Sequence, residues 1–332
     1  LTPPDIKSLT GVIKQHFRMA PGAEFAVEID PRHLPPERVD AFAAAGVNRI
    51  SFGVQDFNPK VQAAINRLQT FEITKAAADA FRARGIAALN IDLVYGLPHQ
   101  TVASVSRTIE QILTLRPDRI AVFGYAHVPN RARHQKMIPT DALPGHHERY
   151  LQARRIAEMV TGAGYRQLGI DHFALAHDEL ATRPLKRNFQ GYTTDDCDAI
   201  IGFGASAIGR LPQGYVQNAV PVADWEALIA RHGVATVRGF ELSADDRLRG
   251  HVIERLMCDF TFSRTDLLAR FGNAASPVIA EAEAIIRDDR DGFVERTDDG
   301  FRCTDAGRVF VRKLCARFDA YWGGSANHAL AV

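Results

Sequence analysis

The sequence predicts an α/β protein: a domain of parallel strands alternating with helices, followed by a helical, winged-helix-like C-terminal domain. Strand-like and helical runs alternate four times before residue 126, the pattern of parallel strands joined by right-handed helical crossovers. After about residue 237 helical runs dominate, followed by a short hairpin and a closing helix. We therefore expect residues 1–235 to form the first domain and residues 236–332 the second.

The first predicted helix has a well-marked start. Thr2 precedes Pro3 and Pro4, as an N-cap residue precedes proline in the first turn. The chain begins with Leu1 rather than Met and has no secretory signal. A chain that opens directly on a capped helix suggests that an earlier segment has been lost, so we expect an N-terminal truncation.

The remaining elements follow from apolar periodicity and from glycine or proline stops. Strands are predicted at residues 24–30, 49–55, 88–95, 119–126 and 166–173. Helices are predicted at residues 34–45, 60–68, 74–84, 101–115 and 151–162. In the second domain we expect helices at residues 245–258, 265–271 and 277–287, a hairpin within 293–303, and a helix at 304–321.

Composition excludes several classes of protein. Apolar residues make up 46% and charged residues 24% of the 332 residues, and the formal charge is +1, so neither a nucleic acid nor a membrane surface is required as a partner. No apolar run approaches the roughly 20 residues that span a bilayer. The four cysteines lie far apart, which argues against a disulfide framework and favours a reducing cytoplasm.

Polar residues cluster where the predicted strands end. Alternation alone does not separate a doubly wound sheet from a barrel, but parallel α/β folds, barrels especially, gather catalytic groups at the carboxyl edge of their strands. An acidic residue there also commonly caps the next helix. Because such residues follow four strands in succession, we favour a shared site. They are Glu28, Asp30, Gln55, Asp56, Asp92, Tyr125 and His127.

Other motifs give weaker signals. The segment Gly202-x-Gly204-x-x-Ala207 matches a relaxed dinucleotide fingerprint, but Gly209 and Pro212 would break the helix that such a site requires. The cysteines and histidines lack the spacing of a metal site, so no metal ligand is predicted. A DNA-binding role for residues 236–332 would need a basic face, which is missing.

Several segments together resemble the oxygen-independent coproporphyrinogen III dehydrogenases, a radical S-adenosylmethionine (radical SAM) family of heme biosynthesis. The Arg-Asn-Phe-Gln-Gly-Tyr-Thr-Thr run is the most specific of them, and agreement covers essentially the whole chain. The matching segments are Glu28–Pro31, Asn48–Phe57, Asn90–Pro98, Tyr125–Pro129, Asp171–Ala174 and Arg187–Thr194.

The resemblance implies a fold, an activity and cofactors. The fold would be an incomplete parallel (β/α) radical-SAM barrel. Two propionates of coproporphyrinogen III would be oxidatively decarboxylated to vinyls by 5′-deoxyadenosyl radical chemistry, giving protoporphyrinogen IX. The cofactors would be a [4Fe-4S] cluster and two SAM molecules. The family's Cys-x-x-x-Cys-x-x-Cys loop and Gly-Gly-Thr-Pro segment are not in this sequence, so we expect the activity to belong to the full-length protein and the fragment to be inactive.

The resemblance also implies cofactor-binding residues, but no catalytic residue. Glu28 would contact the first SAM. Gln55, Arg67 and Asp92 would hold the second, with Arg67 pairing to its carboxylate through a two-pronged guanidinium bond. Ala126 and Ile208 would give backbone or apolar contacts, and Phe189 and Gln190 would line the second site. Taken alone, Arg67 would be a helix-surface charge and Gln55 a strand-end cap. The substrate's carboxylates would need cations, for which Arg131, Arg133, Arg187 and Arg210 are candidates.

The expected partners are coproporphyrinogen III and an unidentified electron donor and acceptor. No nucleic acid or membrane partner is expected, and the protein is expected to be a cytoplasmic monomer. The main alternative is a heme-binding radical SAM relative that acts as a heme chaperone and does not turn over porphyrinogen. The Phe189-Gln190-Gly191-Tyr192 segment argues against that alternative.

Overall fold

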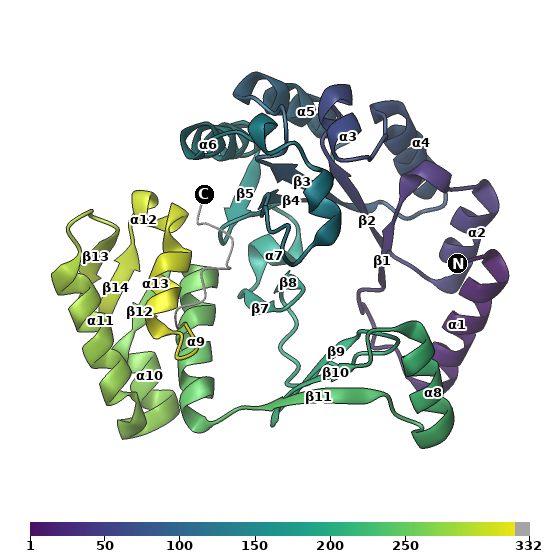
Figure 1. Ribbon diagram of the computed structural model, residues 1–332. Helices are drawn as coiled ribbons and strands as arrows, with labels where there is room; N and C mark the ends of the chain where they lie inside the picture. The colour runs from purple at the N-terminus through teal and green to yellow at the C-terminus, as the bar shows by residue number, and fades with distance from the viewer. Residues whose placement is uncertain (323–332) are drawn as a thin grey trace. The chain divides into compact units, whose positions relative to one another are not determined.

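The computed structural model describes residues 1–322, which fall into two compact units, one from Leu1 to Arg183 and a second that begins at Pro184 (Figure 1). Residues 323–332, the end of the predicted C-terminal domain, lie outside the described residues. The domain boundary after residue 235, predicted from the change to helical runs in the sequence, stays a prediction.

The first unit contains the alternating strands and helices. Its elements are α1 (Pro3–His16), β1 (Ala26–Ile29), η1 (Pro31–His33), α2 (Pro36–Ala45), β2 (Arg49–Gln55), α3 (Pro59–Ala64), α4 (Phe71–Arg82), β3 (Ala88–Tyr95), α5 (Val102–Thr114), β4 (Arg119–Gly124), η2 (Arg133–Met137), η3 (Thr140–Ala142), α6 (His146–Gly162), β5 (Tyr165–Leu168), β6 (His172–Leu175) and α7 (Glu179–Thr182). Local chemistry explains the ends: Thr2 and Asp5 form a capping box on α1, and Gly46 at φ 92° ends α2.

These strands form one six-stranded sheet in the order β1-β2-β3-β4-β6-β5. Strands β1 to β4 pair in parallel, whereas β6 pairs antiparallel with both β4 and β5. The parallel strands follow one another without a reversal of order, as in a barrel rather than a doubly wound sheet. Among the described residues the sheet is open, with β1 and β5 at its edges. The predicted mixed α/β fold is confirmed.

The helices cover one face of the sheet (Figure 1). Side chains of α2, α4, α5 and α6 join the inward residues of β2, β3 and β4 in one buried core. Phe52 of β2 and Phe81 of α4 lie at its centre with ring centroids 6.3 Å apart, and both are fully buried. Consecutive right-handed crossovers place all the helices on the same side, so the other face of the sheet is left to polar residues.

The amino edge of the sheet is held by ion pairs. Asp178, whose side chain is 3% exposed, accepts from Arg119 Nε at 2.9 Å and pairs with Arg49 NH2 at 3.3 Å. Glu24 also pairs with Arg49 Nε, at 2.8 Å, and with Arg119 NH1, at 3.1 Å. These arginines begin β2 and β4, so the cluster holds the end of the sheet opposite the polar strand ends.

The second unit contains small antiparallel sheets and a helical module. Its elements are β7 (Lys186–Asn188), β8 (Gly191–Thr193), β9 (Ile208–Leu211), β10 (Gly214–Asn218), α8 (Val222–His232), β11 (Thr236–Glu241), α9 (Ala244–Asp259), β12 (Thr261–Ser263), α10 (Arg264–Phe271), η4 (Gly272–Ala275), α11 (Ser276–Asp288), β13 (Val294–Thr297), β14 (Gly300–Cys303), α12 (Asp305–Val309) and α13 (Val311–Phe318). Its sheets run β7-β8, β11-β10-β9 and β12-β14-β13.

From α9 onward the order is helix, strand, two helices and a hairpin, which confirms the winged-helix-like C-terminal module. Phe262 of β12 stacks on Phe301 of β14 and Phe318 of α13, with ring centroids 5.4 and 5.8 Å apart. No helix among residues 1–322 combines the length and the apolarity needed to cross a membrane.

Some predicted elements were wrong in detail. The strand expected at 166–173 is a hairpin, β5 and β6, which turns at Gly169 (φ 52°). Helix α6 begins at His146 rather than at residue 151, and the closing helix divides at Phe310. The strand β9 follows Ala207, where a dinucleotide fingerprint would require a helix.

Candidate functional site

The face of the sheet away from the helices carries a row of polar side chains. Along β2 and β3, buried Phe52 and Ile91 alternate with partly exposed Ser51, Asn90 and Asp92, because successive side chains of a strand point to opposite faces. In the register of the sheet, Ser51 lies opposite Asn90, and Gly53 lies opposite Asp92. The polar side chains therefore form a continuous strip across neighbouring strands.

Asp92 lies at the centre of this strip. Asn90 Nδ2 donates to Asp92 Oδ1 at 3.0 Å and to Ser51 Oγ at 2.8 Å, and Ser51 Oγ lies 3.4 Å from Asp92 Oδ2. Burial raises the pKa of the Asp92 carboxyl, and the nearby Glu28 carboxylate raises it further, against the lowering effect of Asn90 and His172. The site thus concentrates two acidic groups where a positively charged ligand would relieve their repulsion.

Arg67 and Gln55 meet at Gly53. Arg67 NH2 donates to Gly53 O at 2.6 Å, and Gln55 adopts a left-handed φ of 67° at the end of β2. A Cβ added at Gly53 would lie 2.8 Å from Gln55 Nε2 and 3.6 Å from Arg67 NH2. Glycine at residue 53 therefore lets both side chains lie against the strand.

The guanidinium of Arg67 has one hydrogen-bond donor without an acceptor among the described residues. Burial lowers the pKa of this group, while Asp30 and Glu28 favour its charged form. Its Nε atom is buried and makes no hydrogen bond with any described residue. A buried unpaired donor costs about 1–3 kcal/mol, so a carboxylate ligand that accepted from this side chain would be bound favourably.

A buried network of polar side chains holds the segment that follows β2, next to Gln55 and Arg67. Asp56, 1% exposed, accepts from the Asn58 backbone N–H, from Thr108 Oγ1 at 3.0 Å, and from Gln100 Nε2. Burial raises the pKa of the Asp56 carboxyl, although these hydrogen bonds oppose the shift. Sequence reasoning placed Asp56 among the strand-end acids but missed its partners, which lie 44 and 52 residues away.

Gln62 extends the network toward Arg67. Its Nε2 donates to the backbone carbonyls of Asp56 (2.9 Å) and Gln69, and its Oε1 accepts from Gln69 N at 3.0 Å. Gln62 and Gln69 are both almost fully buried. Through Gln62, these hydrogen bonds join Asp56, next to Gln55, to Gln69, which lies two residues after Arg67.

Ala126 lies on the loop that follows β4. Its carbonyl accepts from Gln135 Nε2 at 3.0 Å, and Gln135 Oε1 accepts from Val128 N at 2.6 Å. Tyr125 Oη lies 3.2 Å from His127 Nδ1, and burial raises the pKa of the Tyr125 hydroxyl. The structure therefore places Glu28, Gln55 and Asp92 on neighbouring strands of one sheet. Arg67 is bonded to Gly53 of β2, and Ala126 follows the end of β4 at Gly124.

The other three predicted residues belong to the second unit. Phe189 and Gln190 form the turn between β7 and β8, where the side chain of Asn188 accepts from Gln190 N at 2.8 Å. Phe189 is 44% exposed, and Ile208, 36% exposed, begins β9 in a different sheet. That these residues join the first five around a ligand stays a prediction.

Residues 1–322 include no group of three or more His, Cys, Asp or Glu side chains that could hold a metal ion. The four cysteines are unpaired; Cys197 is exposed, and Cys258, Cys303 and Cys315 are buried. Burial raises the pKa of the Cys258 and Cys315 thiols to about 12, the opposite of what a thiolate ligand needs. These residues do not fit an iron–sulfur cluster.

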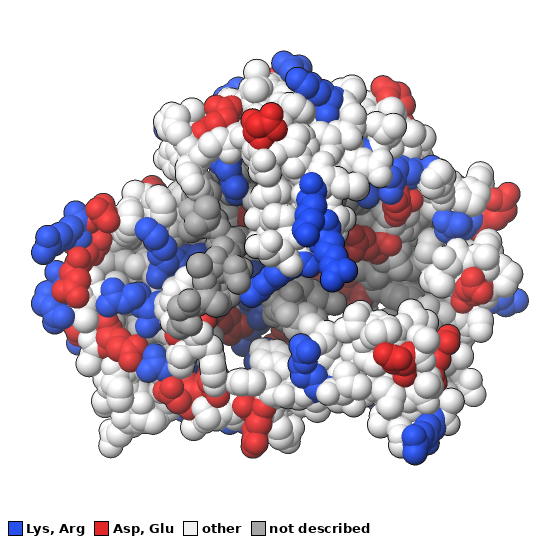
Figure 2. All heavy atoms as spheres, viewed as in Figure 1, with Lys and Arg blue, Asp and Glu red and all other residues white. Residues whose placement is uncertain are grey.

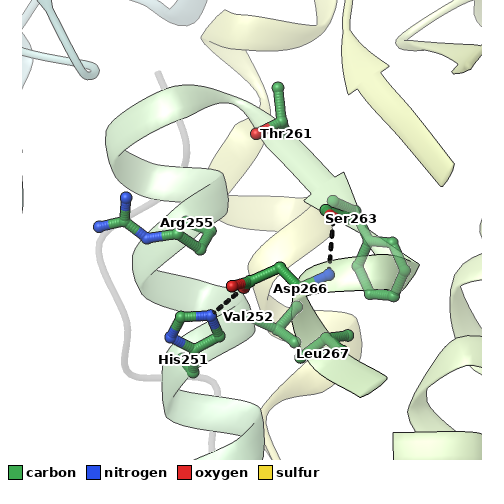
Figure 3. Close-up of a pocket in the computed structure, with 8 residues that line it drawn as sticks. His251, Val252, Arg255, Thr261, Ser263, Asp266 and Leu267 are labelled. Carbon is green, nitrogen blue, oxygen red and sulfur yellow. Dashed lines mark hydrogen bonds and ion pairs between the residues drawn. The ribbon is translucent and has the colours of Figure 1, made fainter. Parts of the chain in front are cut away.

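A cavity of about 160 Å³ lies within the winged-helix-like module, between α9, β12 and α10 (Figure 3). His251 Nε2 contacts Asp266 Oδ2 at 2.5 Å, and Asp266 N donates to Ser263 Oγ at 3.0 Å. Arg255 is bonded to Asp259 and to the Leu185 carbonyl. Because His251, Asp266 and Ser263 are bonded to one another within the module, we interpret this cavity as part of the packing of the helices.

Known proteins match the whole chain. Residues 2–112 match the radical SAM superfamily, and residues 242–310 match the HemN C-terminal domain. An oxygen-independent coproporphyrinogen III oxidase of Bradyrhizobium diazoefficiens is 47% identical over 337 aligned residues, which cover 100% of this chain and 75% of that protein. A protein of the same name from Pseudomonas aeruginosa is 37% identical over 97% of this chain and 71% of its own length.

A solved structure agrees with these sequence matches. Coproporphyrinogen III oxidase (HemN) from Escherichia coli, described as a radical SAM enzyme, superposes with a TM-score of 0.91 and 35% identity. The match covers 97% of this chain and 75% of that one. Radical SAM proteins use SAM and a [4Fe-4S] cluster. The resemblance to this family that the sequence motifs indicated is confirmed. The chain belongs to the oxygen-independent coproporphyrinogen III oxidase family of radical SAM enzymes.

Proposed function

We propose that this chain forms the SAM- and substrate-binding body of an enzyme that oxidatively decarboxylates two propionates of coproporphyrinogen III to vinyl groups, without oxygen, in heme biosynthesis. The observation that supports this most strongly is the agreement with the Escherichia coli coproporphyrinogen III oxidase over 97% of the chain. The cluster-binding motif is not in this sequence, so we assign the activity to the full-length protein.

The polar strip suits SAM, which carries both an ammonium group and a carboxylate. Arg67, with its buried unpaired Nε, would bind the methionyl carboxylate through a charge-assisted bond. Asp92, whose pKa is raised by burial and by Glu28, would accept from the ammonium or a ribose hydroxyl. When bound and reduced, SAM supplies the hydrogen-abstracting radical; these side chains bind and orient it.

We further propose that two SAM molecules bind. Glu28 would contact the first, whereas Gln55, Arg67 and Asp92 would hold the second. Ala126 would offer its backbone beside the second molecule. Phe189, Gln190 and Ile208, from the second unit, would complete that site. The left-handed backbone of Gln55 (φ 67°) supports a binding role, because such strain is retained mainly where function needs it.

The remaining partners are also proposals. An unidentified electron donor would reduce the cluster, and an unidentified acceptor would take the electron left after decarboxylation. We propose a monomeric cytoplasmic protein with no nucleic-acid or membrane partner. The formal charge of +1 supports the exclusion of nucleic acid, since non-specific binding depends on neutralised phosphates.

The test is anaerobic turnover by the full-length protein, reconstituted with iron and sulfide and supplied with SAM, a chemical reductant and coproporphyrinogen III. Product would be oxidised and separated by chromatography with fluorescence detection. We expect protoporphyrinogen IX to form only when SAM is present. Stoichiometric heme binding without porphyrinogen turnover would contradict the proposal and would favour a heme chaperone.

A further inference from the structure

The loop that follows β4 displays cations without partners. Arg131, Arg133 and Lys136 are all exposed, and no carboxylate of residues 1–322 pairs with any of them. We call residues 128–137 the cationic loop. The nearest acidic residue along the chain is Asp141 in η3. Figure 2 shows a run of basic side chains on the face in view, over the teal loop that follows β4 in Figure 1.

The backbone of the cationic loop is held in place. The N–H groups of Arg131 and Ala132 both donate to Val128 O at 2.9 Å, and the two bonds of the Gln135 amide tie the loop back to Ala126 and Val128. Beyond the loop, His99 N donates to Ala142 O at 2.8 Å. The cations therefore project from an ordered backbone, so a ligand need not order the loop to bind them.

The position of the loop connects it to the site. It leaves the carboxyl end of β4, and Tyr125 N donates to Tyr95 O, at the end of β3, at 2.8 Å. The carboxyl ends of parallel strands meet at one edge of a sheet. The cationic loop thus starts at the same edge as Gln55 and at the strand next to Asp92.

We propose that Arg131, Arg133 and Lys136 bind propionate carboxylates of the substrate; this inference rests on the proposed function. A porphyrinogen with four propionates is a tetra-anion, and the acidic groups Glu28 and Asp92 beside the SAM site would repel it. Cations at the rim of the site offset that repulsion, attract the anion over a distance and select for carboxylate-bearing rings. Two guanidinium groups allow two-pronged bonds.

Two variants of the full-length protein isolate this effect. The triple variant Arg131→Gln, Arg133→Gln, Lys136→Gln removes the three charges of the loop. A matched control, Lys7→Gln, Arg107→Gln, Arg116→Gln, removes the same number of exposed charges from α1, α5 and the turn before β4. None of the control side chains has a carboxylate partner among the described residues.

The measurement is a fluorescence titration with coproporphyrin III, the oxidised tetracarboxylate, as the probe. Exposed ion pairs change affinity by about two- to fivefold each, so the loop variant should bind about tenfold or more weakly. The difference should shrink as salt rises from about 50 mM to about 500 mM. The tetramethyl ester of the probe should bind equally to wild type and loop variant, and the control variant should bind the tetracarboxylate as wild type does.

Equal affinity of wild type and loop variant for the tetracarboxylate would overturn the inference, as would absence of binding by the wild type. Weakened delivery of electrons by a protein donor, with porphyrin affinity unchanged, would also overturn it and would mark a redox-partner surface. Binding requires neither the cluster nor turnover. Failure of the loop variant to lose affinity while the wild type turns over substrate would therefore reject this inference and leave the proposed function intact.

Discussion

Replacing Asp56 by alanine would test the polar network that supports the site. The change removes the acceptor of three donors: the Asn58 backbone N–H, Gln100 Nε2 and Thr108 Oγ1. Gln100 Nε2 retains the Val94 carbonyl at 2.9 Å as an acceptor. Thr108 Oγ1 still accepts from the Phe57 N–H at 3.4 Å, but its own hydroxyl proton loses the Asp56 acceptor. Among the described residues, the Asn58 N–H and the Thr108 hydroxyl are therefore the two donors left without an acceptor.

The magnitude follows from these contacts. A buried donor left without an acceptor costs about 1–3 kcal/mol, which applies to Asn58 N–H and Thr108 O–H, and the lost Gln100 bond adds about 0.5–1.5 kcal/mol. Part of this is offset, because the wild type itself buries a carboxyl whose pKa burial has raised. We therefore expect Asp56→Ala to lower the free energy of unfolding by about 3 kcal/mol.

The assay is urea unfolding followed by circular dichroism, with the slope checked so that midpoints are comparable. The control is Asp79→Ala, an exposed residue of α4 whose one ion-pair partner among residues 1–322 is Lys75, for which we expect a loss below about 0.5 kcal/mol. Because Asp56 holds the turn next to Gln55, Asp56→Ala should also weaken SAM binding. A loss below about 1 kcal/mol with unchanged SAM affinity would refute the reasoning.

Three further predictions concern the sheet. Burial raises the pKa of Asp92, so the folded protein retains this proton to higher pH than the unfolded chain, and stability falls as pH rises above about 4. Asp92→Asn should therefore bind SAM weakly. It should nevertheless be up to about 1 kcal/mol more stable than wild type at about pH 8 and no more stable near pH 4. Thermal unfolding measured across pH would show this difference. Asp178→Ala removes the buried carboxylate that Arg49 and Arg119 share, leaving them the half-exposed Glu24, and it removes the N-cap of α7. It should cost about 3 kcal/mol in urea unfolding, and an unchanged midpoint would contradict a structural role for the cluster. Gly53→Ala displaces the side-chain amide of Gln55, so calorimetry should show weaker SAM binding with a stability change below about 1 kcal/mol, and unchanged affinity would count against this geometry.

The regular part of the fold was predictable because its signals are local. The run from Ala88 to Tyr95 alternates buried and partly buried residues, and it forms β3 with the predicted bounds. The hairpin of β5 and β6 was not predictable in the same way. Its strands are four residues each, and β6 is fixed by antiparallel pairing with β4, about fifty residues earlier in the chain.

The candidate site was predictable only where side chains follow strands. Alternation placed Asp92 at a strand end, and the same alternation could have found Ser51 and Asn90, which share its face. The partners of Asp56 could not be found this way, because Gln100 and Thr108 read as ordinary polar residues in and before a helix. Their role depends on contacts between distant segments, which no local pattern encodes.

The central claim, that the carboxyl edge of the sheet binds SAM through Arg67, is tested most directly by calorimetric titration of SAM into the full-length protein. Wild type would be compared with Arg67→Gln and with Arg107→Gln, an exposed change on α5. A charge-assisted bond contributes about 1.5–3 kcal/mol, so we predict SAM affinity at least about tenfold weaker for Arg67→Gln and unchanged for Arg107→Gln. Equal affinity of wild type and Arg67→Gln for SAM would contradict the claim.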